Sequence, residues 1–474
     1  MGKDGAEGED TAMADTAARA ALLTGWGRTA PTAATVRRPR TPEEAAELLR
    51  AAAEQPPTRR RGAIARGLGR SYGDAAQCAG GTVIDCADLA PGFRLAPGRA
   101  EVTASAGTGL AELIGRLLPH GRFPPVVPGT RHVTVGGAIG ADIHGKNHRA
   151  ASSFGAHVRA LRLLTPDGEH RALSPGSDPD LFWATVGGMG LTGIVTEATF
   201  AVDAVETSAM RVDTDRVPDL DAAMALMDAG DGEHPHPYAA CWIDLLARGA
   251  ALGRGVVTRA RHARVGELAP ARRRNPLAYA PRPAAAAPPL VPPRLLNSSS
   301  VRAFNAAYYA RAPRRGRGAV RPLASFFHPL DAVRDWNRLY GPHGLVQYQF
   351  AVPLGAEEEL RRIVADLAAA RAPSFLAVLK RLGNGTPAPL SFPLPGWTLA
   401  LDLPGDLPGL APLLLRLDER VLAAGGRLYL AKDSRARPDT MQAMYPRLEE
   451  WRAVRARADP DGVLTSDLAR RLEL

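Results

Sequence analysis

The chain has 474 residues, of which 45% are apolar and 23% charged, and its formal net charge is +10. This length exceeds what one compact core usually supports, so we expect two domains of ordinary globular composition. The positive charge indicates an anionic partner such as nucleic acid, a membrane surface or a phosphorylated substrate, although a general bias toward arginine gives the same value. Aromatic residues make up only 5% of the chain, which argues against single-stranded nucleic-acid binding.

The cysteines and the amino-terminal segment bear on the cellular compartment. Cys78, Cys86 and Cys241 lack the spacing of metal ligands, and their odd number makes no disulfide framework, so we expect no metal site and a reduced, cytoplasmic setting. Residues 1–18 are acidic and rich in small residues, without a signal-peptide pattern, and are predicted to form a disordered tail. No apolar run approaches the ~20 residues of a membrane span, so any membrane association is expected to be peripheral.

In chain order, the first half of the sequence alternates between strands, helices and glycine turns. Thr41 can cap a helix over 41–55, and Gly121 can end another over 110–121. Turn residues predict a hairpin over 157–173. The further predicted elements are a strand leading into a glycine turn at 60–74, strands at 80–89 and 100–110, and a short helix, glycine turn and strand across 178–202.

Two glycine motifs in this half are similar to nucleotide-binding loops, and neither is complete. Residues 140–147 read G-x-x-x-x-G-K-N, but the phosphate loop of nucleotide hydrolases needs Ser or Thr after the lysine to ligate magnesium. Residues 188–193 read G-x-G-x-x-G, but the dinucleotide fingerprint needs a strand before it and a helix after it. In the second motif the predicted order is the reverse. We therefore reject a nucleotide hydrolase for the first motif, where Asn147 follows the lysine, and a Rossmann site for the second.

The second half opens with a predicted helix at 219–228 and a predicted strand at 238–247. Between Glu267 and Asp331 the chain has no acidic residue but eleven arginines, and it is rich in Pro and Ala. Because such a composition cannot bury a core, we expect a mobile basic loop at about 267–320. This segment is either a solvated linker or a lid that contacts anionic lipid or phosphate.

Three segments with strand character follow, at 344–353, 374–383 and 396–404, and we expect them in one sheet. Alternation places Gln347 and Gln349 on one face and Tyr348 on the other. The two amides indicate either a polar wall of a ligand site or an exposed sheet edge. A strand and turn at 425–435 and helices within 444–472 close the chain.

Six motifs, taken in order, resemble one enzyme family: ARGLGRSYGD, PGTRHVTVGGAIGADIHGKNH, FWATVGGMGLTGI, VQYQF, PLSFPLPGW and LYLAKDSR. From about Leu23 onward the sequence is similar to the decaprenylphosphoryl-ribose oxidases of actinobacterial cell-wall arabinan synthesis, within the vanillyl-alcohol-oxidase flavoprotein family. The resemblance implies an α+β fold with a PCMH-type FAD-binding domain over 19–208. It also implies a substrate-binding domain built on an antiparallel sheet over 209–426, and a segment over 427–474 that returns to the FAD domain.

The resemblance implies that glycine-rich segments hold FAD, with the pyrophosphate on main-chain N–H groups rather than on a Rossmann helix. Many members of the wider family link the flavin through a histidine at the position of Arg70, so FAD is expected to be non-covalent here. The expected cofactor-binding residues are Ala65, Arg66, Gly67, Leu68, Gly69, Arg70, Ser71, Tyr72, Gly73, Asp74, Gly129, Thr134, Val135, Gly136, Gly137, Ala141, Asp142, Ile143, His144, Ile194 and Tyr429.

The resemblance further implies which residues meet the substrate. Lys432, His144 and Tyr72 are the expected catalytic residues. Lys432 can accept the hydroxyl proton or bind the substrate phosphate as a point charge, and both roles stay open. The expected substrate-binding residues are Lys146, Gln347, Gln349, Lys380, Thr398, Ala400 and Lys432. Well-known relatives carry cysteine at the position of Ala400 and asparagine at that of Thr398, and the flavin chemistry needs neither group.

The implied activity is oxidation of the ribose 2-hydroxyl of decaprenylphosphoryl ribose to a 2-keto intermediate. A short-chain NAD-dependent reductase would complete the epimerisation to decaprenylphosphoryl arabinose. The expected location is the cytoplasm, at the inner membrane, with the periplasmic face also open. Two alternatives are an FAD-dependent oxidase of a soluble polyol or aldonolactone and a non-catalytic nucleic-acid-binding protein. The eleven arginines favour a phosphorylated substrate over a free sugar.

Overall fold

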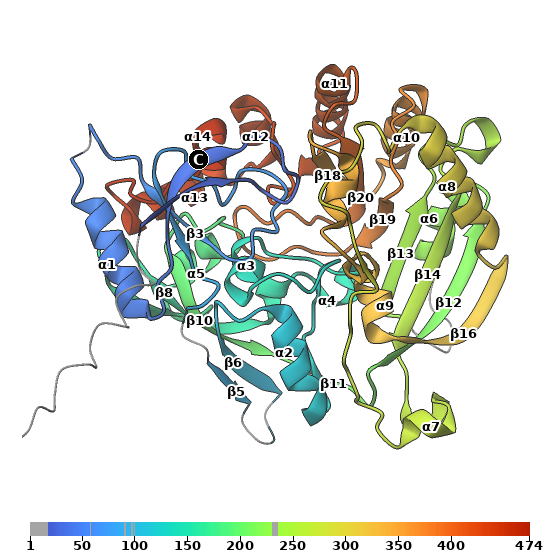
Figure 1. Ribbon diagram of the computed structural model, residues 1–474, viewed down its shortest axis with the longest axis horizontal. Helices are drawn as coiled ribbons and strands as arrows, with labels where there is room; N and C mark the ends of the chain where they lie inside the picture. The colour runs from blue at the N-terminus through green and yellow to red at the C-terminus, as the bar shows by residue number, and fades with distance from the viewer. Residues whose placement is uncertain (1–17, 57, 90–91, 96–97, 99, 230–235) are drawn as a thin grey trace, which may run out of the picture.

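The computed structural model describes residues 18–229, apart from 57, 90–91, 96–97 and 99, and residues 236–474. The tail expected at 1–18 therefore lies almost wholly outside the described residues. Two lobes stand side by side in Figure 1. The first lobe contains a four-stranded and a five-stranded sheet, and the second lobe contains one eight-stranded sheet. Helices accompany both, so the expected α+β fold is confirmed.

The four-stranded sheet of the first lobe has the strand order β1-β2-β4-β3. Its strands are β1 (Arg19–Leu23), β2 (Thr32–Arg37), β3 (Ala63–Arg66) and β4 (Thr82–Asp85). The parallel pair of β2 with β4 needs a long connection, and α1 (Pro42–Ala53) lies within it. Thr41 caps α1 by accepting a hydrogen bond from the amide of Glu44, so the helix predicted over 41–55 is confirmed.

The five-stranded sheet is antiparallel, with the order β5-β6-β10-β8-β9. Its strands are β5 (Phe93–Leu95), β6 (Glu101–Ser105), β8 (Val158–Leu164), β9 (His170–Leu173) and β10 (Ile194–Ala201). The pair β8 and β9 is the predicted hairpin. The helix α5 (Pro179–Thr185) precedes the G-x-G-x-x-G segment and β10 follows it, which confirms the order that excludes a Rossmann motif.

Short elements connect the strands of this lobe. The predicted helix at 110–121 forms as α2 (Leu110–Leu117) and a 3-10 turn that ends at Gly121, whose φ of 66° suits glycine. The other connecting elements are η1 (Leu118–His120), β7 (Arg122–Phe123), α3 (Val135–Gly140), α4 (His148–Ala151), η2 (Phe154–His157) and β11 (Asp203–Ala204).

The eight-stranded sheet is antiparallel throughout, with the order β16-β12-β14-β13-β19-β20-β18-β21. The three strands predicted from 344 to 404 are β18, β19 and β20, and they are neighbours as expected. The strands are β12 (Ala209–Val217), β13 (Tyr238–Ile243), β14 (Gly255–His262), β16 (Arg315–Pro322), β18 (Leu345–Pro353), β19 (Ala377–Leu382), β20 (Gly396–Pro404) and β21 (Arg427–Leu428).

Helices cover one face of this sheet and leave the other toward the first lobe (Figure 1). The covering helices are α6 (Leu220–Asp228), α10 (Glu357–Ala369) and α11 (Leu410–Ala423). Leu379 and Leu399, which point to these helices, are fully buried. Because side chains alternate along a strand, Lys380 and Thr398 point to the opposite face. The sheet thus offers its polar face to the space between the lobes.

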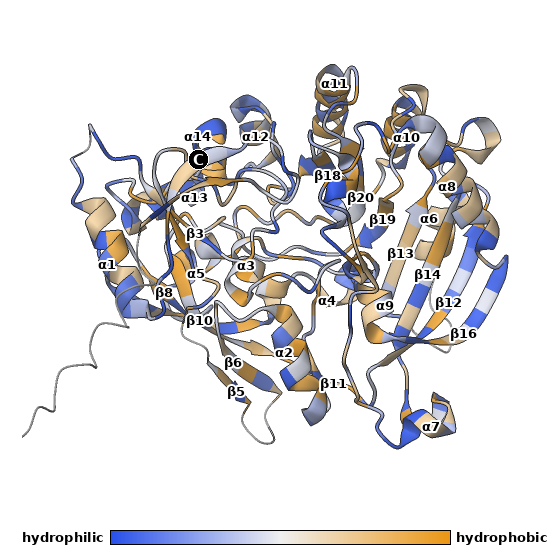
Figure 2. Ribbon diagram, viewed as in Figure 1, coloured by the Kyte–Doolittle hydropathy of each residue, from blue (hydrophilic) through white to orange (hydrophobic). Residues whose placement is uncertain are grey.

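The basic segment is more regular than we predicted. It contains α8 (Ser298–Arg311), capped by Asn297, which accepts hydrogen bonds from the amides of residues 299 and 300. The further elements from 249 to 340 are η3 (Gly249–Ala251), η4 (Val265–Glu267), α7 (Pro270–Arg273), β15 (Ala285–Ala286), α9 (Leu323–Phe327), η5 (Pro329–Ala332), β17 (Val333–Arg334) and η6 (Trp336–Tyr340). The expectation of a plain loop at 267–320 was therefore wrong for α8 and for β16, which is a largely hydrophilic edge strand (Figure 2). The mobility of this segment stays a prediction.

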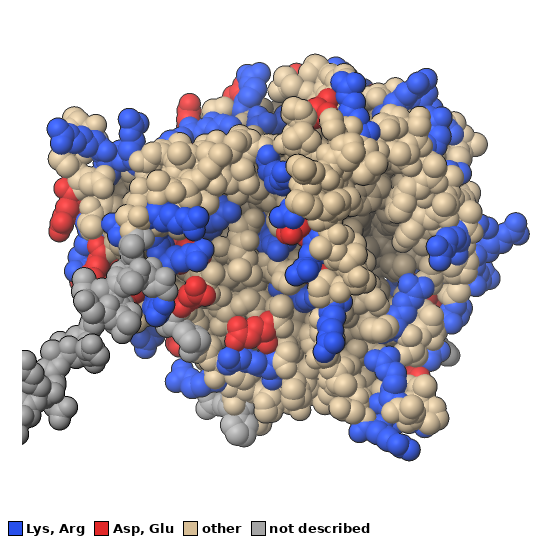
Figure 3. Space-filling model, in the orientation of Figure 1, with Lys and Arg blue, Asp and Glu red and all other residues tan. Residues whose placement is uncertain are grey.

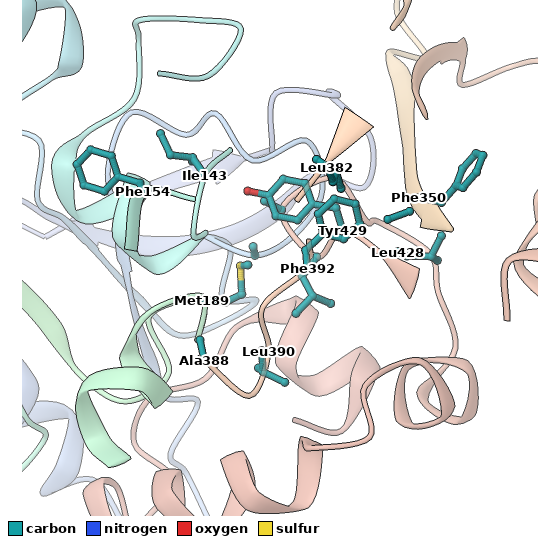
Figure 4. Close-up of a cluster of buried hydrophobic side chains, with 14 of the residues drawn as sticks. Ile143, Phe154, Met189, Phe350, Leu382, Ala388, Leu390, Phe392, Leu428 and Tyr429 are labelled. Carbon is teal, nitrogen blue, oxygen red and sulfur yellow. The ribbon is translucent and has the colours of Figure 1, made fainter. Parts of the chain in front are cut away.

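After β21 the chain returns to the first lobe through α12 (Pro438–Met444), α13 (Leu448–Ala458) and α14 (Asp467–Leu472). Leu464 forms a parallel bridge with Ala63 of β3, and the three helices lie beside the blue strands in Figure 1. The lobes share one apolar core. Figure 4 shows Met189 of the first lobe and Phe350 of the large sheet in the same cluster as Tyr429.

Candidate active site

A cavity of about 440 Å³ lies between the two lobes and has walls from both. Nearly all of the residues predicted to bind cofactor or substrate line it. The exceptions are Gly73, Asp74, Val135, Asp142 and Thr398. Segments that are far apart in the sequence therefore meet at one place, and the following paragraphs build this place from its parts.

The first glycine segment, residues 67–74, follows β3 and offers unpaired main-chain donors. In the part of the chain that the structure describes, the backbone N–H groups of residues 68–71 donate no hydrogen bond. Gly69 has a φ of 62°, and a Cβ there would lie 2.3 Å from the guanidinium of Arg66. Arg66 and Arg70 also line the cavity. Free N–H groups beside two guanidinium groups suit a bound anion.

The second glycine segment forms the short helix α3. Thr134 caps α3 by accepting a hydrogen bond from the amide of Gly137 at 3.1 Å, and the amide of Gly136 donates to Ala106 O at 2.8 Å. These amides are already paired and cannot donate to a ligand. The glycines of this segment instead let its backbone lie close to the neighbouring residues. A Cβ at Gly67 would lie 2.3 Å from Thr134 Oγ1, which shows how tightly the two glycine segments meet.

The cavity is strongly cationic. Lys146, Lys380 and Lys432 line it together with the two arginines, and within the described ranges no Asp or Glu does. Lys146 donates to the carbonyl of Phe326. Neither ammonium group of Lys380 and Lys432 has a hydrogen-bond acceptor among the described residues, although that of Lys432 lies 3.9 Å above the ring centre of Tyr72. Both groups are free to bind an anionic ligand.

Burial lowers the pKa of all three lysines. It lowers the pKa of Lys380 to about 8, and burial together with the charge of Lys380 lowers that of Lys146 to about 7. Burial also lowers the pKa of Lys432, where the carboxylate of Asp402 acts in the opposite direction. Neutral and charged lysines therefore lie close in free energy near neutral pH, which suits proton transfer as well as anion binding.

His144 lies on the cavity wall in a neutral state. The side-chain amide of Gln349 donates to its Nε2 at 2.8 Å, so the ring proton belongs on Nδ1, which has no partner in the described structure. Burial, with the charge of Lys380, lowers the pKa of His144. Its ring meets that of Tyr429 edge to face at 4.9 Å. An unsatisfied buried N–H of this kind is suited to a ligand acceptor.

Thr398 lies on the same face of the sheet as Lys380, but Gln349 bonds to it and it does not line the cavity. It is fully buried, donates to Phe350 O at 2.7 Å, and its hydroxyl accepts a hydrogen bond from Gln349 at 3.2 Å. This hydroxyl therefore orients Gln349 and does not face the cavity. Gln347 and Gln349 both line the cavity and Tyr348 does not, so the predicted alternation is confirmed and the polar-wall interpretation holds over that of an exposed edge.

The remaining exceptions serve the framework. Val135 is a fully buried core residue of α3. Asp142 accepts hydrogen bonds from the amide of Gly155 and the hydroxyl of Thr386, and burial raises its pKa to about 6. It joins the two lobes instead of facing the cavity. Gly73 and Asp74 contact the carboxyl-terminal segment, as described below.

Comparison with known proteins follows the same division. Residues 33–174 match the model of an FAD binding domain, and residues 414–472 match that of D-arabinono-1,4-lactone oxidase. The decaprenylphosphoryl-beta-D-ribose oxidase of Mycolicibacterium smegmatis is 46% identical over 95% of this chain and 97% of its own. The chain belongs to the decaprenylphosphoryl-β-D-ribose oxidase family. It is therefore an FAD-dependent oxidoreductase.

Two further relatives mark how far the similarity extends. An uncharacterized protein of Streptomyces coelicolor is 46% identical over 77% of this chain and 99% of its own. Cytokinin dehydrogenase 1 of rice is 31% identical over 52% of this chain and 48% of its own. The cytokinin dehydrogenase match extends over only part of each chain, whereas the similarity within the oxidase family covers nearly all of this one.

The residues present fit an FAD. The free amides of residues 68–71, flanked by Arg66 and Arg70, would hold the pyrophosphate, and glycines on both sides admit the cofactor to the backbone. His144 and Tyr429 line the same cavity and would offer a polar and an aromatic contact to the flavin ring. No cluster of His, Cys, Asp and Glu suited to a metal occurs within the described ranges.

Sequence reasoning missed several residues of this cavity. The guanidinium carbon of Arg70 lies 3.7 Å from the ring centre of Trp26. The rings of Trp242 and Tyr308 pack on the cavity wall with their centres 4.6 Å apart. A lone aromatic gives no periodic signal. Asp402 does not line the cavity but contacts Gln347 of its wall, and it was missed because one carboxylate inside an apolar strand gives no pattern.

Proposed function

We propose that this chain oxidises the ribose 2-hydroxyl of decaprenylphosphoryl-β-D-ribose to a ketone. This would be the first half of its epimerisation to decaprenylphosphoryl arabinose for cell-wall arabinan. The observation that carries the proposal is the pair of unpaired ammonium groups, Lys380 and Lys432, in the cavity that also holds the amide donors of residues 68–71. Such a cavity accommodates a second anion beside the cofactor. The relative from Mycolicibacterium smegmatis, 46% identical, is named for this substrate.

The chemistry requires loss of a hydroxyl proton and a hydride from one carbon. FAD, when bound, accepts the hydride. Lys432 in its neutral form would accept the proton, or in its charged form would bind the phosphate. Tyr72 holds the ammonium group over its ring, and neutral His144 can donate a hydrogen bond from Nδ1. Lys146, Lys380, Gln347, Gln349 and Ala400 would bind the sugar phosphate.

The same proposal includes a non-covalent flavin. Arg70, at the position where other members of the wider family link the flavin, stacks on Trp26. Cys86 is another nucleophile that lines the cavity. Burial raises the pKa of its thiol to about 12, so it is not a thiolate at neutral pH.

A polyprenyl substrate requires access to lipid, and we propose peripheral contact with the inner membrane. Among the helices that the structure describes, none is long and apolar enough to cross a bilayer. Lys and Arg side chains gather over β16 and near α7 in Figure 3. Leu290 and Phe304 are exposed by 88% and 48% within this basic region. Arginines with exposed apolar side chains support contact with anionic lipid. The expected partner is an NAD-dependent short-chain reductase that completes the epimerisation.

Replacement of Lys432 by Ala tests the proposed site. The variant should fold and bind FAD, because Lys432 donates to no acceptor among the described residues, and it should lose flavin reduction by farnesylphosphoryl ribose at least about 100-fold. Absorbance of the bound flavin under anaerobic conditions gives both quantities. A turnover rate of the variant within a few-fold of the parent's would show that Lys432 only packs in the cavity and would contradict its proposed role.

A second candidate is an FAD-dependent oxidase of a soluble polyol or aldonolactone. It is favoured by the match of residues 414–472 to D-arabinono-1,4-lactone oxidase. That match covers the turn with Lys432 and the helices α12 to α14, but not the cavity wall with Lys380. The lysines of the cavity wall favour the phosphorylated substrate over a soluble polyol, since a free sugar has no negative charge to pair with them.

A further inference from the structure

One guanidinium connects the glycine segment of the cavity to the turn that carries Lys432. Arg471 of α14 donates two hydrogen bonds to the carboxylate of Asp74, at 2.9 and 2.8 Å. It donates a third to the carboxylate of Asp433 at 2.8 Å and a fourth to Ala436 O at 2.9 Å. Asp74 ends the glycine segment, and Asp433 directly follows Lys432.

The two connected segments also touch each other directly. The amide of Tyr72 donates to Ala431 O at 3.0 Å. A Cβ at Gly73 would lie 1.9 Å from Asp433 O, so the backbones meet without room for a side chain. Because the ammonium group of Lys432 rests on the ring of Tyr72, a shift between the two segments would move this ammonium group relative to the cavity.

The bridge depends on the geometry of arginine. The side chains of Arg471, Asp74 and Asp433 are exposed by only 23%, 14% and 4%, so water shields these charges weakly. Asp433 is fixed independently, because its other oxygen accepts the amide hydrogens of Arg435 and Ala436. Lysine would keep the charge but cannot form the same planar set of hydrogen bonds. Arg471 is thus the side chain that joins the two segments, in addition to their direct backbone contacts.

We propose that Arg471 is a positioning residue that fixes the FAD-binding glycine segment relative to Lys432. It does not line the cavity and acts through Asp74 and Asp433. The part that concerns FAD follows from the family, and the part that concerns Lys432 rests on the proposed function. Loss of this bridge leaves only the backbone contacts between the two segments, so the free amides of residues 68–71 can shift relative to the ammonium group of Lys432.

The experiment compares Arg471→Lys with Arg470→Lys in the full-length protein. Arg470 is the neighbour on α14 and contacts Asp467 and the carbonyl of Arg61, so it is a matched control. FAD dissociation constants come from flavin fluorescence, and visible circular dichroism reports the surroundings of the bound flavin. R471K should bind FAD about tenfold more weakly, as for one lost charged hydrogen bond, with an altered dichroism spectrum, whereas R470K should match the parent.

A triple variant separates positioning from stability. R471M with D74N and D433N removes the three charges together and leaves none unpaired, so the Tm of the apoprotein should return toward that of the parent. The weaker FAD binding and the altered spectrum should persist. Parental FAD affinity and dichroism in R471K, or in the triple variant, would overturn the proposal. None of these readouts uses the sugar substrate, so a parent that binds FAD but does not oxidise prenylphosphoryl ribose refutes the proposed substrate alone.

Discussion

Replacement of Asp402 by Asn would show how the charge of Lys432 is set. Asp402 is fully buried in β20, opposite Gln347 of β18, and its Oδ1 accepts a hydrogen bond from Gln347 Nε2 at 2.5 Å. Its Oδ2 has no partner among the described residues. The carboxylate raises the pKa of Lys432, whereas burial and the charge of Lys380 lower it. Asparagine keeps the shape and removes the charge.

The direction and size of the change follow from this arrangement. A nearby opposite charge shifts a pKa by about 1–3 units, and one unit is worth about 1.4 kcal/mol. The variant should therefore lower the pKa of Lys432 by at least about one unit. If neutral Lys432 accepts the proton, the rising limb of the pH–rate profile moves to lower pH. If charged Lys432 binds the phosphate, the falling limb moves to lower pH instead. The limb that moves identifies the role left open by the sequence.

Stability provides an independent reading of the same pair. Burial raises the pKa of Asp402, so its contribution to stability is present below its unfolded pKa and is lost as the pH rises through its folded pKa. As the pH rises from the unfolded to the folded pKa of Asp402, the Tm of the parent should fall relative to that of the Asn variant. For Lys432, whose folded pKa is lowered, the free energy of unfolding rises with pH up to the unfolded pKa, over a wider window in the variant.

The assay is anaerobic stopped-flow flavin reduction by farnesylphosphoryl ribose between about pH 5 and 9. Asp418→Asn is the control, since Asp418 is another buried carboxylate that contacts Tyr348 and Arg435 outside the cavity. It should lower the Tm but leave the midpoints of the profile unchanged. Midpoints that coincide in parent and Asp402→Asn, or that move to higher pH, would refute the electrostatic link.

Three further outcomes are expected. Acid or heat precipitation should leave the yellow colour in the supernatant, because Arg70 cannot link to the flavin; colour in the pellet would contradict this. Limited proteolysis should cut first within 267–320, where α8 buries little, and anionic vesicles should protect the cut site; a resistant segment in the free protein would count against a mobile lid. Gly67→Ala should weaken FAD binding at least about tenfold, because its Cβ would lie 2.3 Å from Thr134 Oγ1, whereas Gly115→Ala, with no atom within 4 Å, should not; equal affinities would remove the argument from close packing.

Periodic and capped segments could be predicted from the sequence. The Thr41 cap, the hairpin over 157–173 and the three neighbouring strands from 344 to 404 all form. In each of these, local pattern and tertiary packing favour the same structure. The shared face of Gln347 and Gln349 followed for the same reason.

The errors have particular causes. The short helix α3 was not predicted, because it contains three glycines of low helix propensity; it forms because Thr134 caps it and the core buries Val135 and Ile139. The helix α8 buries only Val301 and Asn305, so its apolar pattern was too weak to detect. Neither Asp402 nor the bridge from Arg471 to the glycine segment could be predicted, since a contact across 397 positions leaves no local signal.

Oxidation of a prenylphosphoryl ribose is tested most directly by measuring which sugar reduces, and so bleaches, the bound flavin. Under anaerobic conditions, farnesylphosphoryl ribose should reduce the bound FAD and be converted to the 2-keto product. Addition of an NADH-dependent short-chain reductase should then yield the arabinose epimer. Free ribose and xylitol should reduce the flavin at least about 100-fold more slowly, because they lack the phosphate and prenyl chain whose proposed contacts would position the sugar for reaction. Equal rates with the free sugars would contradict the account and favour an oxidase of soluble polyols.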